Sequence, residues 1–314
     1  MEKIKLVYFA TPKLALSTFE HILNSKDFEV LALVTQTPKP SGRGNKIIDS
    51  ELKKCALEHN IEVIETPKIS KDIETLRKLK AYGADFFVTF AFGQILSQEV
   101  LDIPKCATIN VHPSLLPKYR GSNPIRACLL NGDCKTGITT AVTVLALDEG
   151  DIVLQEEFEI TPDTTSFELE EIIEQKAPKI LEETLIGLKE CKLKPYPQLG
   201  EVCYTIKTKK EDKNLCFNLD CTQVHNKIRA LLGQYTCQST FNGKLIKFTK
   251  TTCAICDKNI ECGEVVEITK KGIVVKCSKG AILVQKVKPE GKGEMDAYVW
   301  SLGSKIKIGD KFGS

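Results

Sequence analysis

Two polar residues, Asn110 and His112, have the types and the spacing that catalysis would use. Asn110 lies in the apolar run CATINV at residues 106–111, and His112 follows that run directly. A spacing of two residues places both side chains on the same face of a β-strand. An amide donor beside an imidazole can stabilise a developing oxyanion and transfer a proton. The alternative is a structural histidine whose hydrogen bonds are satisfied within the fold.

An acidic segment, LDEGD at residues 147–151, is the second candidate for chemistry. It carries three carboxylates within four residues around a glycine, as a turn between two strands would. The ligand spacing of an EF-hand loop is missing, which argues against Ca²⁺. One of these carboxylates could face His112 and either select its tautomer or raise its pKa. A solvated turn without a catalytic role is the alternative.

The elements that must position these residues alternate between strands and helices. Apolar runs predict strands at residues 4–10, 30–34, 61–64, 85–90 and 106–111, with helical patterns between them. This alternation predicts the α/β class with a mostly parallel, Rossmann-like sheet, whose ligands bind beyond the carboxyl ends of the strands. The Gly-x-Gly-x-x-Gly fingerprint and the P-loop pattern are both absent, which argues against a dinucleotide module and a P-loop NTPase.

The pattern changes in the second part of the chain. Strands at 138–145 and 152–160 precede a long helix at 166–189, which Thr165 and Glu168 begin with a capping box. A polar segment with two prolines and a glycine follows the helix. Beyond it come a short helix and then short strands with hairpin signals, predicted at 235–241, 244–249, 264–269, 272–276 and 281–287. Short strands at this spacing predict a small OB-like β-barrel.

The expected organisation is therefore a first domain at 1–190, a linker at 191–206 and the barrel at 207–314. A length of 314 residues agrees with two domains of roughly 150 residues each. The net charge of +3 hides a difference between the two parts. Residues 201–314 contain 20 Lys and Arg against 12 Asp and Glu, a balance of +8, whereas the rest of the chain carries −5. Such a basic segment is a sign of a polyanionic partner.

Composition also bears on compartment and thiol chemistry. The chain has no run of about 18 uncharged apolar residues and no signal-peptide pattern, so we expect a soluble, cytoplasmic protein without membrane contact. The 13 cysteines are then expected to be free thiols, most of them small buried hydrophobic residues. Cys253 and Cys256, with Cys262 and Cys277 beyond, could instead form a zinc site, although the second pair lacks Cys-x-x-Cys spacing.

Several motifs together resemble one enzyme family. The run NVHPSLLPKYRG at 110–121, followed by LDEGDI at 147–152, is similar to the 10-formyltetrahydrofolate-dependent formyltransferases. The loop TQTPKPSGRG at 35–44 and the run AFGQIL at 91–96 resemble segments of the members that act on tRNA. Essentially the whole chain is covered, with modest departures such as Ala10 in place of a glycine.

The resemblance implies a reaction and roles for particular residues. A formyl group would pass from N10 of 10-formyltetrahydrofolate to the α-amine of methionine on initiator tRNA, for translation initiation, without a metal or a covalent intermediate. Asn110 and, when protonated, His112 would donate to the tetrahedral oxyanion. Asp148 would accept from His112 or relay the released proton through water. The folate would be bound by Ser114, Leu115, Leu116, Pro117, Phe92, Gly93, Gln94 and Ile95.

The same resemblance implies contacts with RNA. Lys39, Arg43 and Lys46 on the first loop would contact the acceptor stem, and the basic barrel would hold the tRNA body through its phosphates, with the protein acting as a monomer. Two alternatives stay open. A sibling formyltransferase would act on a nucleotide-linked amine and leave the basic barrel unexplained. A non-catalytic RNA-binding protein on the same scaffold would have no use for the three polar side chains.

Overall fold

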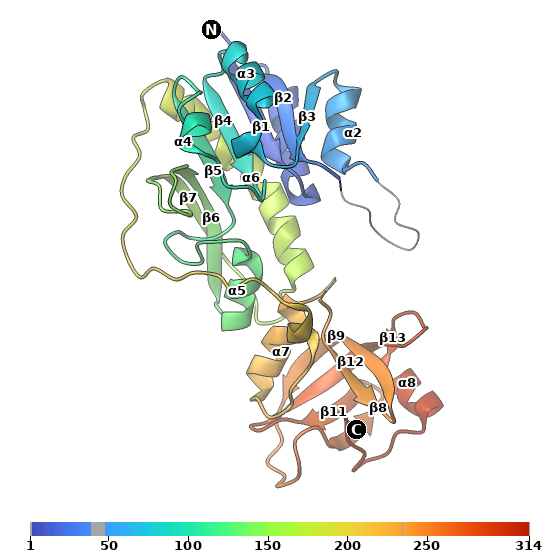
Figure 1. Ribbon diagram of the computed structural model, residues 1–314. Helices are drawn as coiled ribbons and strands as arrows, with labels where there is room; N and C mark the ends of the chain where they lie inside the picture. Colours follow the sequence, from blue (N-terminus) through green and yellow to red (C-terminus); the bar gives the residue numbers. More distant parts are fainter. Residues whose placement is uncertain (1, 39–47, 234, 314) are drawn as a thin grey trace. The chain divides into compact units, whose positions relative to one another are not determined.

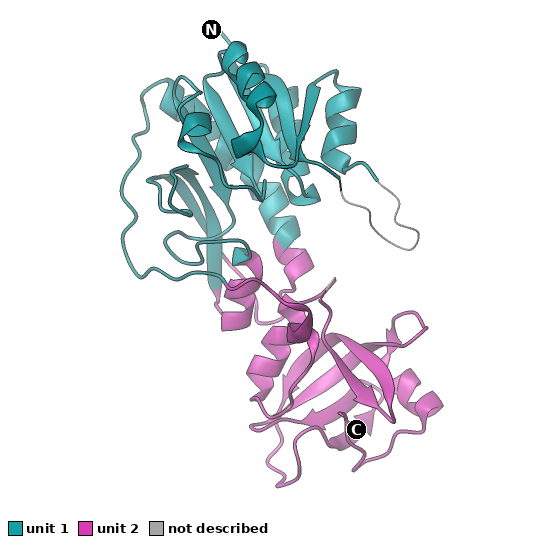
Figure 2. Cartoon of the chain, in the orientation of Figure 1, with its two compact units in different colours: residues 1–124, 135–158, 170–205 teal, residues 125–134, 159–169, 206–314 magenta. Residues whose placement is uncertain are grey.

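A computed structural model describes residues 2–38, 48–233 and 235–313, and the chain divides into two compact units (Figure 2). Unit 1 contains residues 1–124, 135–158 and 170–205, and unit 2 contains residues 125–134, 159–169 and 206–314. The division is not a single cut, because two short segments that precede residue 170 belong with unit 2. No helix within the described ranges is long and apolar enough to cross a membrane.

Unit 1 is built on a sheet whose strands, among the described residues, follow the order β3-β2-β1-β4-β5-β6-β7 (Figure 1). They are β1 (Ile4–Ala10), β2 (Phe28–Gln36), β3 (Glu62–Thr66), β4 (Phe86–Phe90), β5 (Ala107–His112), β6 (Lys135–Val142) and β7 (Ile152–Glu159). All neighbours from β3 to β5 run parallel, and β6 is antiparallel to β5. The predicted mostly parallel α/β sheet is confirmed. Its five parallel strands bring their carboxyl ends to one edge.

Helices connect these strands close to the predicted positions. They are the 3₁₀ helix η1 (Lys13–Ala15), α1 (Leu16–Asn24), α2 (Glu51–Glu58), the 3₁₀ helix η2 (Ile69–Lys71), α3 (Ile73–Tyr82), α4 (Gln98–Leu101), α5 (Pro124–Asn131) and α6 (Ser166–Lys189). The capping box of α6 is present: the Thr165 amide donates to the Glu168 carboxylate at 2.7 Å, and the Glu168 amide donates to Thr165 Oγ1 at 3.3 Å. The sequence pattern did not predict α5, nor α4, which is too short to show a clear 3.6-residue period.

The interior strand β1 is buried on both faces, which explains its continuous apolar sequence at residues 6–10. On one face the ring of Tyr8 lies 5.2 Å, centroid to centroid, from the ring of Phe19 in α1. On the other face Phe9 belongs to a buried cluster that includes Leu76 and Leu79 of α3. With both faces covered by helices, the carboxyl edge of the sheet is the place where polar side chains can meet a ligand.

Unit 2 contains an antiparallel sheet of order β10-β11-β12-β9-β8, with β13 paired to β12. Its elements are the 3₁₀ helix η3 (Lys210–Lys213), α7 (Cys221–Ala230), β8 (Gln238–Phe241), β9 (Lys244–Ala254), β10 (Val265–Thr269), β11 (Gly272–Lys276), β12 (Ala281–Pro289), β13 (Met295–Asp296) and α8 (Ala297–Ser304). The five predicted strands are present, and β9 and β12 are longer than predicted. The sequence pattern did not predict the two-residue strand β13 or the mostly apolar helix α8.

The two edge strands of this sheet are joined through residues 310–313. The Val265 amide of β10 donates to the Asp310 carbonyl at 2.8 Å. The Gly313 amide donates to the Thr240 carbonyl of β8 at 2.9 Å. The segment therefore lies between β10 and β8, and the sheet closes into the small barrel that was predicted.

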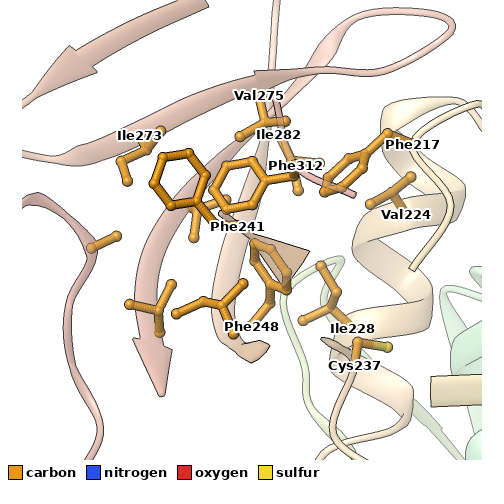
Figure 3. Packing of buried hydrophobic residues seen from close by; sticks show 14 of the residues in the cluster. Phe217, Val224, Ile228, Cys237, Phe241, Phe248, Ile273, Val275, Ile282 and Phe312 are labelled. Atoms are coloured by element: carbon orange, nitrogen blue, oxygen red, sulfur yellow. The ribbon is translucent and has the colours of Figure 1, made fainter. Parts of the chain in front are cut away.

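Aromatic and branched aliphatic side chains fill the barrel (Figure 3). The ring of Phe312 lies 5.5 Å from that of Phe248, 5.7 Å from that of Phe241 and 6.0 Å from that of Phe217, measured between centroids. Trp300 of α8 stacks on Phe312 at 6.1 Å with an interplanar angle of 29°. Such aromatic pairs add about 0.5–1.5 kcal/mol each beyond their buried area. The closing segment is thus held by its own core residue as well as by its backbone.

All 13 cysteines are free thiols, as predicted. The expectation that most of them are buried is wrong. Only five are buried, namely Cys55, Cys128, Cys237, Cys256 and Cys277, and another five are exposed. Because the thiol side chain is small, its exposure forfeits little burial energy, so the position of a cysteine decides its burial more than its type does.

Candidate active site

Asn110 is placed at the carboxyl edge of unit 1, near the end of β5. Its side-chain Nδ2 donates to Asp148 Oδ1 at 3.2 Å, and its Oδ1 accepts from Thr89 Oγ1 of the neighbouring strand β4 at 2.9 Å. The Asp148 carboxylate can only accept, so it fixes which side of the amide is the donor, and the Thr89 hydroxyl then donates to the other side. The N–H face of Asn110 is turned toward the loop that carries Asp148.

His112 ends β5, and its side chain is only 5% exposed. Its Nε2 lies 2.9 Å from the Tyr119 carbonyl, which can only accept, so Nε2 carries the proton. Its Nδ1 lies 3.8 Å from Asp148 Oδ2. Burial lowers the pKa of His112, and the nearby Asp148 carboxylate and the Tyr119 carbonyl oppose that shift. The imidazole is therefore neutral near pH 7, with an unprotonated Nδ1 directed toward Asp148.

Asp148 lies in the loop between β6 and β7 and joins the two residues of β5. In addition to the contact with Asn110, its Oδ2 accepts from the Gly121 amide at 2.8 Å. Its backbone has a φ of 52°, a left-handed conformation that aspartate tolerates better than most residues. Gly150, two residues later, admits no side chain, because a Cβ there would lie 1.7 Å from the Val142 carbonyl oxygen. The loop is thus shaped so that one carboxylate meets both Asn110 and His112.

Gln198 holds this loop from a segment that the sequence had assigned to a linker. Its Nε2 donates to the Asp148 carbonyl at 2.8 Å and to the Gly150 carbonyl at 2.7 Å. Its Oε1 accepts from Arg120 Nε at 3.1 Å and from Arg120 Nη2 at 2.8 Å. The two ends of one amide therefore connect a buried guanidinium to the backbone on either side of Glu149.

Arg120 completes this network, which we call the clasp and define as Arg120, Glu149, Gln198 and Tyr204. Arg120 Nη1 lies 3.0 Å from Glu149 Oε1 and donates to the Tyr204 hydroxyl at 3.2 Å, and that hydroxyl donates to Glu149 at 2.7 Å. The backbone of Arg120 also pairs with the segment at 203–205, through the Cys203 carbonyl and the Thr205 amide. Sequence reasoning missed Arg120, Gln198 and Tyr204 as parts of the site. For Gln198 and Tyr204, the signal available in the sequence was the presence of polar side chains within the expected linker.

The segment predicted to bind folate after β5, Ser114 to Pro117, is mostly buried. Ser114 is fully buried and donates through Oγ to the Lys118 carbonyl at 2.7 Å, and Leu116 packs in a small cluster with Ala141 and Ile152. Leu115 is partly exposed. These side chains therefore shape the loop that leads to Tyr119 and Gly121, and any contact they make with a ligand involves Leu115 or the backbone.

The second predicted folate segment, Phe92 to Ile95, is divided in the structure. The Phe92 ring is 3% exposed and packs edge-on against Phe9 at 5.4 Å, so it belongs to the core of unit 1. Gln94 ties the loop to the β3 side, since it accepts from the Ile69 amide at 2.8 Å and donates to the Thr66 carbonyl at 2.8 Å. Gly93 has a φ of 75° and is exposed, and Ile95 is 77% exposed. Gly93 and Ile95 are thus the members that face solvent.

Three further apolar residues face solvent just before Asp148 and were not predicted. Val144, Leu145 and Leu147 are between 42% and 57% exposed. Their loop is held beside β5, because the Thr143 amide donates to the Thr108 carbonyl at 2.8 Å. Exposed apolar side chains beside buried polar groups are typical of a site for a flat organic ligand. The signal in the sequence was the run TVLAL immediately before the acidic turn.

Lys39, Arg43 and Lys46 lie outside the described residues. The described residues that lead to them, Thr35 to Pro38, help to line a cavity of about 250 Å³ at the carboxyl ends of β1 and β2, together with Thr11, Ile48, Ser50 and Glu65. For the cysteines considered as zinc ligands, the described ranges contain no group of three or more His, Cys, Asp or Glu side chains that could hold a metal ion.

Comparison with known families defines the class of protein. Residues 4–185 match the formyl transferase family, and residues 207–305 match the formyl transferase C-terminal domain. The fold is shared with an N-formyltransferase from Helicobacter canadensis, which was solved with folinic acid and dTDP-3-aminofucose (TM-score 0.64, 19% identity, 90% of this chain and 99% of that chain). It is also shared with HypX from Aquifex aeolicus, solved with tetrahydrofolic acid (TM-score 0.62, 16% identity, 98% of this chain and 48% of that chain).

Curated relatives of full length narrow the class. Methionyl-tRNA formyltransferase of Clostridium botulinum is 37% identical over 290 residues, covering 92% of this chain and 93% of the relative. That of Clostridium acetobutylicum is 36% identical over 307 residues, covering 98% of each. The chain belongs to the methionyl-tRNA formyltransferase family.

Proposed function

We propose that this protein transfers the formyl group of 10-formyltetrahydrofolate to the α-amino group of methionine on initiator Met-tRNA, for translation initiation. The observation that carries the proposal is the meeting of Asn110, His112 and Asp148 at the carboxyl edge of the sheet. Membership of the family and the basic charge of residues 201–314 support the same substrate pair. We further propose that the protein acts in the cytoplasm as a monomer.

The carbon–nitrogen bond forms by direct attack of the neutral α-amine on the formyl carbon. The formyl oxygen then takes up negative charge, and Nδ2 of Asn110 is the donor that meets it. Because Asp148 and Thr89 already hold the two ends of the amide, the donor need not reorient as the charge develops. Removing one donor of this kind typically costs about 2.7–4 kcal/mol of transition-state stabilisation.

The proton that the amine loses passes to Nδ1 of His112. That atom is unprotonated in the free protein, since Nε2 holds the proton that faces Tyr119. The imidazolium that results is stabilised by Asp148 at 3.8 Å. Collapse of the tetrahedral intermediate breaks the bond to N10, and the same imidazolium can return its proton to that nitrogen. Protons and charges then balance, and the products are tetrahydrofolate and formyl-methionyl-tRNA.

The folate co-substrate is proposed to bind against exposed apolar side chains that follow β4 and β6. We propose that Ile95, together with Val144, Leu145 and Leu147, covers the flat pterin ring. The backbone of residues 114–117 would supply polar contacts. Phe92 and Gln94 would support this wall from behind without touching the ligand. We propose that this reaction proceeds without a metal ion.

RNA binding is proposed for two parts of the chain. Lys39, Arg43 and Lys46 would contact the acceptor stem, and the barrel at 207–314 would bind the tRNA body through phosphates. Residues 1–190 would form the catalytic domain, with 191–206 connecting it to the barrel. Within that connection, Gln198 and Tyr204 would serve the catalytic loop through the clasp.

A formylation assay tests the proposal. Purified protein is given 10-formyltetrahydrofolate and either initiator Met-tRNA or elongator Met-tRNA, and formyl-methionine is measured. We expect rapid formylation of the initiator species and little of the elongator. The control is the His112→Ala protein, whose folding is verified by circular dichroism. This variant should be nearly inactive. Near-full activity of that variant, or formylation of a nucleotide-linked amino sugar in place of tRNA, would overturn the assignment.

A further inference from the structure

A pocket rich in lysine lies on unit 2, apart from the residues proposed for catalysis. We define the basic pocket by the residues that line a cavity of about 230 Å³: Lys250, Lys270, Lys271, Gln285, Lys286, Asp296 and Tyr298. They come from β9, the turn between β10 and β11, β12, β13 and α8. Four of the seven are lysines and one is an acid, so the cavity is strongly cationic.

The sheet places two of these lysines directly opposite each other. Lys286 of β12 pairs with Lys250 of β9 in the antiparallel register. Like charges in directly opposite positions of a sheet repel, because their Cβ atoms are roughly 5 Å apart. Lys286 also lies opposite Asp296 and 3.6 Å from Glu294, but Lys250, Lys270 and Lys271 have no ion pair within the described ranges. An anion in the cavity would relieve this repulsion.

The backbone is irregular at the same place. The pairing of β12 with β9 shifts register on both sides of Lys286, which leaves Gln285 out of the ladder. Bulges of this kind re-aim side chains and are common beside binding sites. The Oε1 atom of Gln285 is buried and has no hydrogen-bond partner among the described residues. A buried acceptor without a donor indicates a partner group that the chain itself does not supply.

We propose that the basic pocket binds a phosphodiester group of RNA together with the nucleoside next to it. This rests on the proposed function, in which tRNA is the substrate. The lysines would neutralise the phosphate, and a ribose 2′-hydroxyl or a base amino group would donate to Gln285 Oε1. The ring of Tyr298 offers a surface for the sugar or base. A free phosphate ion would satisfy the lysines but would leave both Gln285 and Tyr298 unused.

Salt dependence of tRNA binding provides the test. The double variant Lys250→Gln/Lys286→Gln is compared in the full chain with Lys258→Gln/Lys279→Gln, which removes two exposed lysines of the same barrel outside the basic pocket. For the first variant, the slope of log Kd against log salt concentration should become smaller in magnitude by about two. The affinity for tRNA should fall roughly tenfold or more. The control variant should change both quantities much less. The circular dichroism spectrum and melting temperature of both variants should equal those of the wild type, which shows that they fold.

Two further measurements separate the components of the pocket. Gln285→Leu removes no charge, so it should weaken tRNA binding severalfold while it leaves the salt slope unchanged. Titration of the wild type with inorganic phosphate alone should show only millimolar binding. Micromolar phosphate binding that the double lysine variant abolishes would overturn the proposal, because the occupant would then be a free anion.

Failure of this proposal is distinguishable from failure of the proposed function. If the wild type formylates Met-tRNA but the pocket and control variants have the same salt slope, the basic pocket is not an RNA site. If the wild type does not formylate Met-tRNA, the proposed function itself is wrong.

Discussion

The candidate active site of unit 1 and the basic pocket of unit 2 hold their polar groups in opposite ways. At the active site, Asn110 and Asp148 have partners at 2.8–3.2 Å, and the His112 and Asp148 side chains are 5% and 14% exposed. In the basic pocket, Lys286 is 46% exposed and its ion pair is 3.6 Å long. The active site holds its polar groups in place before the substrate arrives, whereas the basic pocket presents solvent-exposed charge.

The difference follows from what each region must stabilise. Charge that develops on one oxygen in a transition state is stabilised by donors that are already aligned and desolvated. A polyanion that arrives from solution is attracted by mobile cations over about a Debye length, and its geometry varies from contact to contact. Changes at the active site should therefore act on kcat, and changes in the basic pocket should act on binding.

The largest effect is expected for Asn110→Ala. Loss of the fixed donor should lower kcat for formyl transfer by about 10²- to 10³-fold, while Kd for Met-tRNA stays within twofold of the wild type. Steady-state kinetics and filter binding on the same preparation measure both quantities. If the Asn110→Ala protein binds Met-tRNA more weakly but keeps a nearly normal kcat, the contrast between the two regions is wrong. The edge of the sheet would then serve binding.

A smaller effect is expected when the clasp is altered at Gln198. In Gln198→Glu the contacts with Arg120 can persist, but a carboxylate replaces the donor to the Asp148 and Gly150 carbonyls, so the catalytic loop loses its support. We expect kcat to fall about tenfold with little change in KM for tRNA, since each of the two lost hydrogen bonds contributes about 1 kcal/mol and a tenfold fall corresponds to about 1.4 kcal/mol.

Tyr204→Phe is the matched control for the clasp. It keeps the ring beside Arg120 and removes only the hydroxyl that bridges Arg120 and Glu149, so its kcat should change less than that of Gln198→Glu. A purely structural role for Gln198 would instead lower the melting temperature of both variants and leave kcat and its pH profile unaltered.

The smallest effect is a shift in the pH profile. Burial lowers the pKa of His112 below its ordinary value of about 6.5. Because the base form is the neutral one, the contribution of His112 to kcat/KM should be constant at and above neutral pH and should fall as the pH drops through the lowered pKa. Asp148→Asn removes the carboxylate that raises this pKa, so its acid limb should lie at still lower pH. An acid limb above pH 7, or a limb that Asp148→Asn moves upward, would contradict the role given to His112.

Local periodicity made most of the fold predictable from the sequence. The apolar run at residues 6–10 of β1 and the short runs of the barrel each depend on a few neighbouring residues. Asn110 and His112 were found because a spacing of two on a strand is itself a local pattern. The closing segment at 310–313 was not predictable in this way, because it pairs with residues about 45 and 70 positions earlier in the chain.

The clasp and the burial of Phe92 were hidden for the same reason. Arg120 and Gln198 are 78 residues apart, and nothing near either residue in the sequence points to the other. Phe92 follows a strand at the ligand-binding edge, yet its ring turns inward because Phe9 of β1 offers an aromatic partner at 5.4 Å. Which side of a loop faces the ligand is decided by such tertiary contacts, and residue type alone does not reveal it.

Trp300, stacked on Phe312 in the barrel, is the only tryptophan of the chain. Selective excitation of indole fluorescence will therefore report on unit 2 alone, although unit 1 contains most of the sheet structure around the reacting groups. Unfolding of the barrel can be followed by emission while circular dichroism follows the whole chain, and a difference between the two transitions would show that the units melt separately. The native protein thus carries a built-in optical probe of its barrel, and no label has to be introduced.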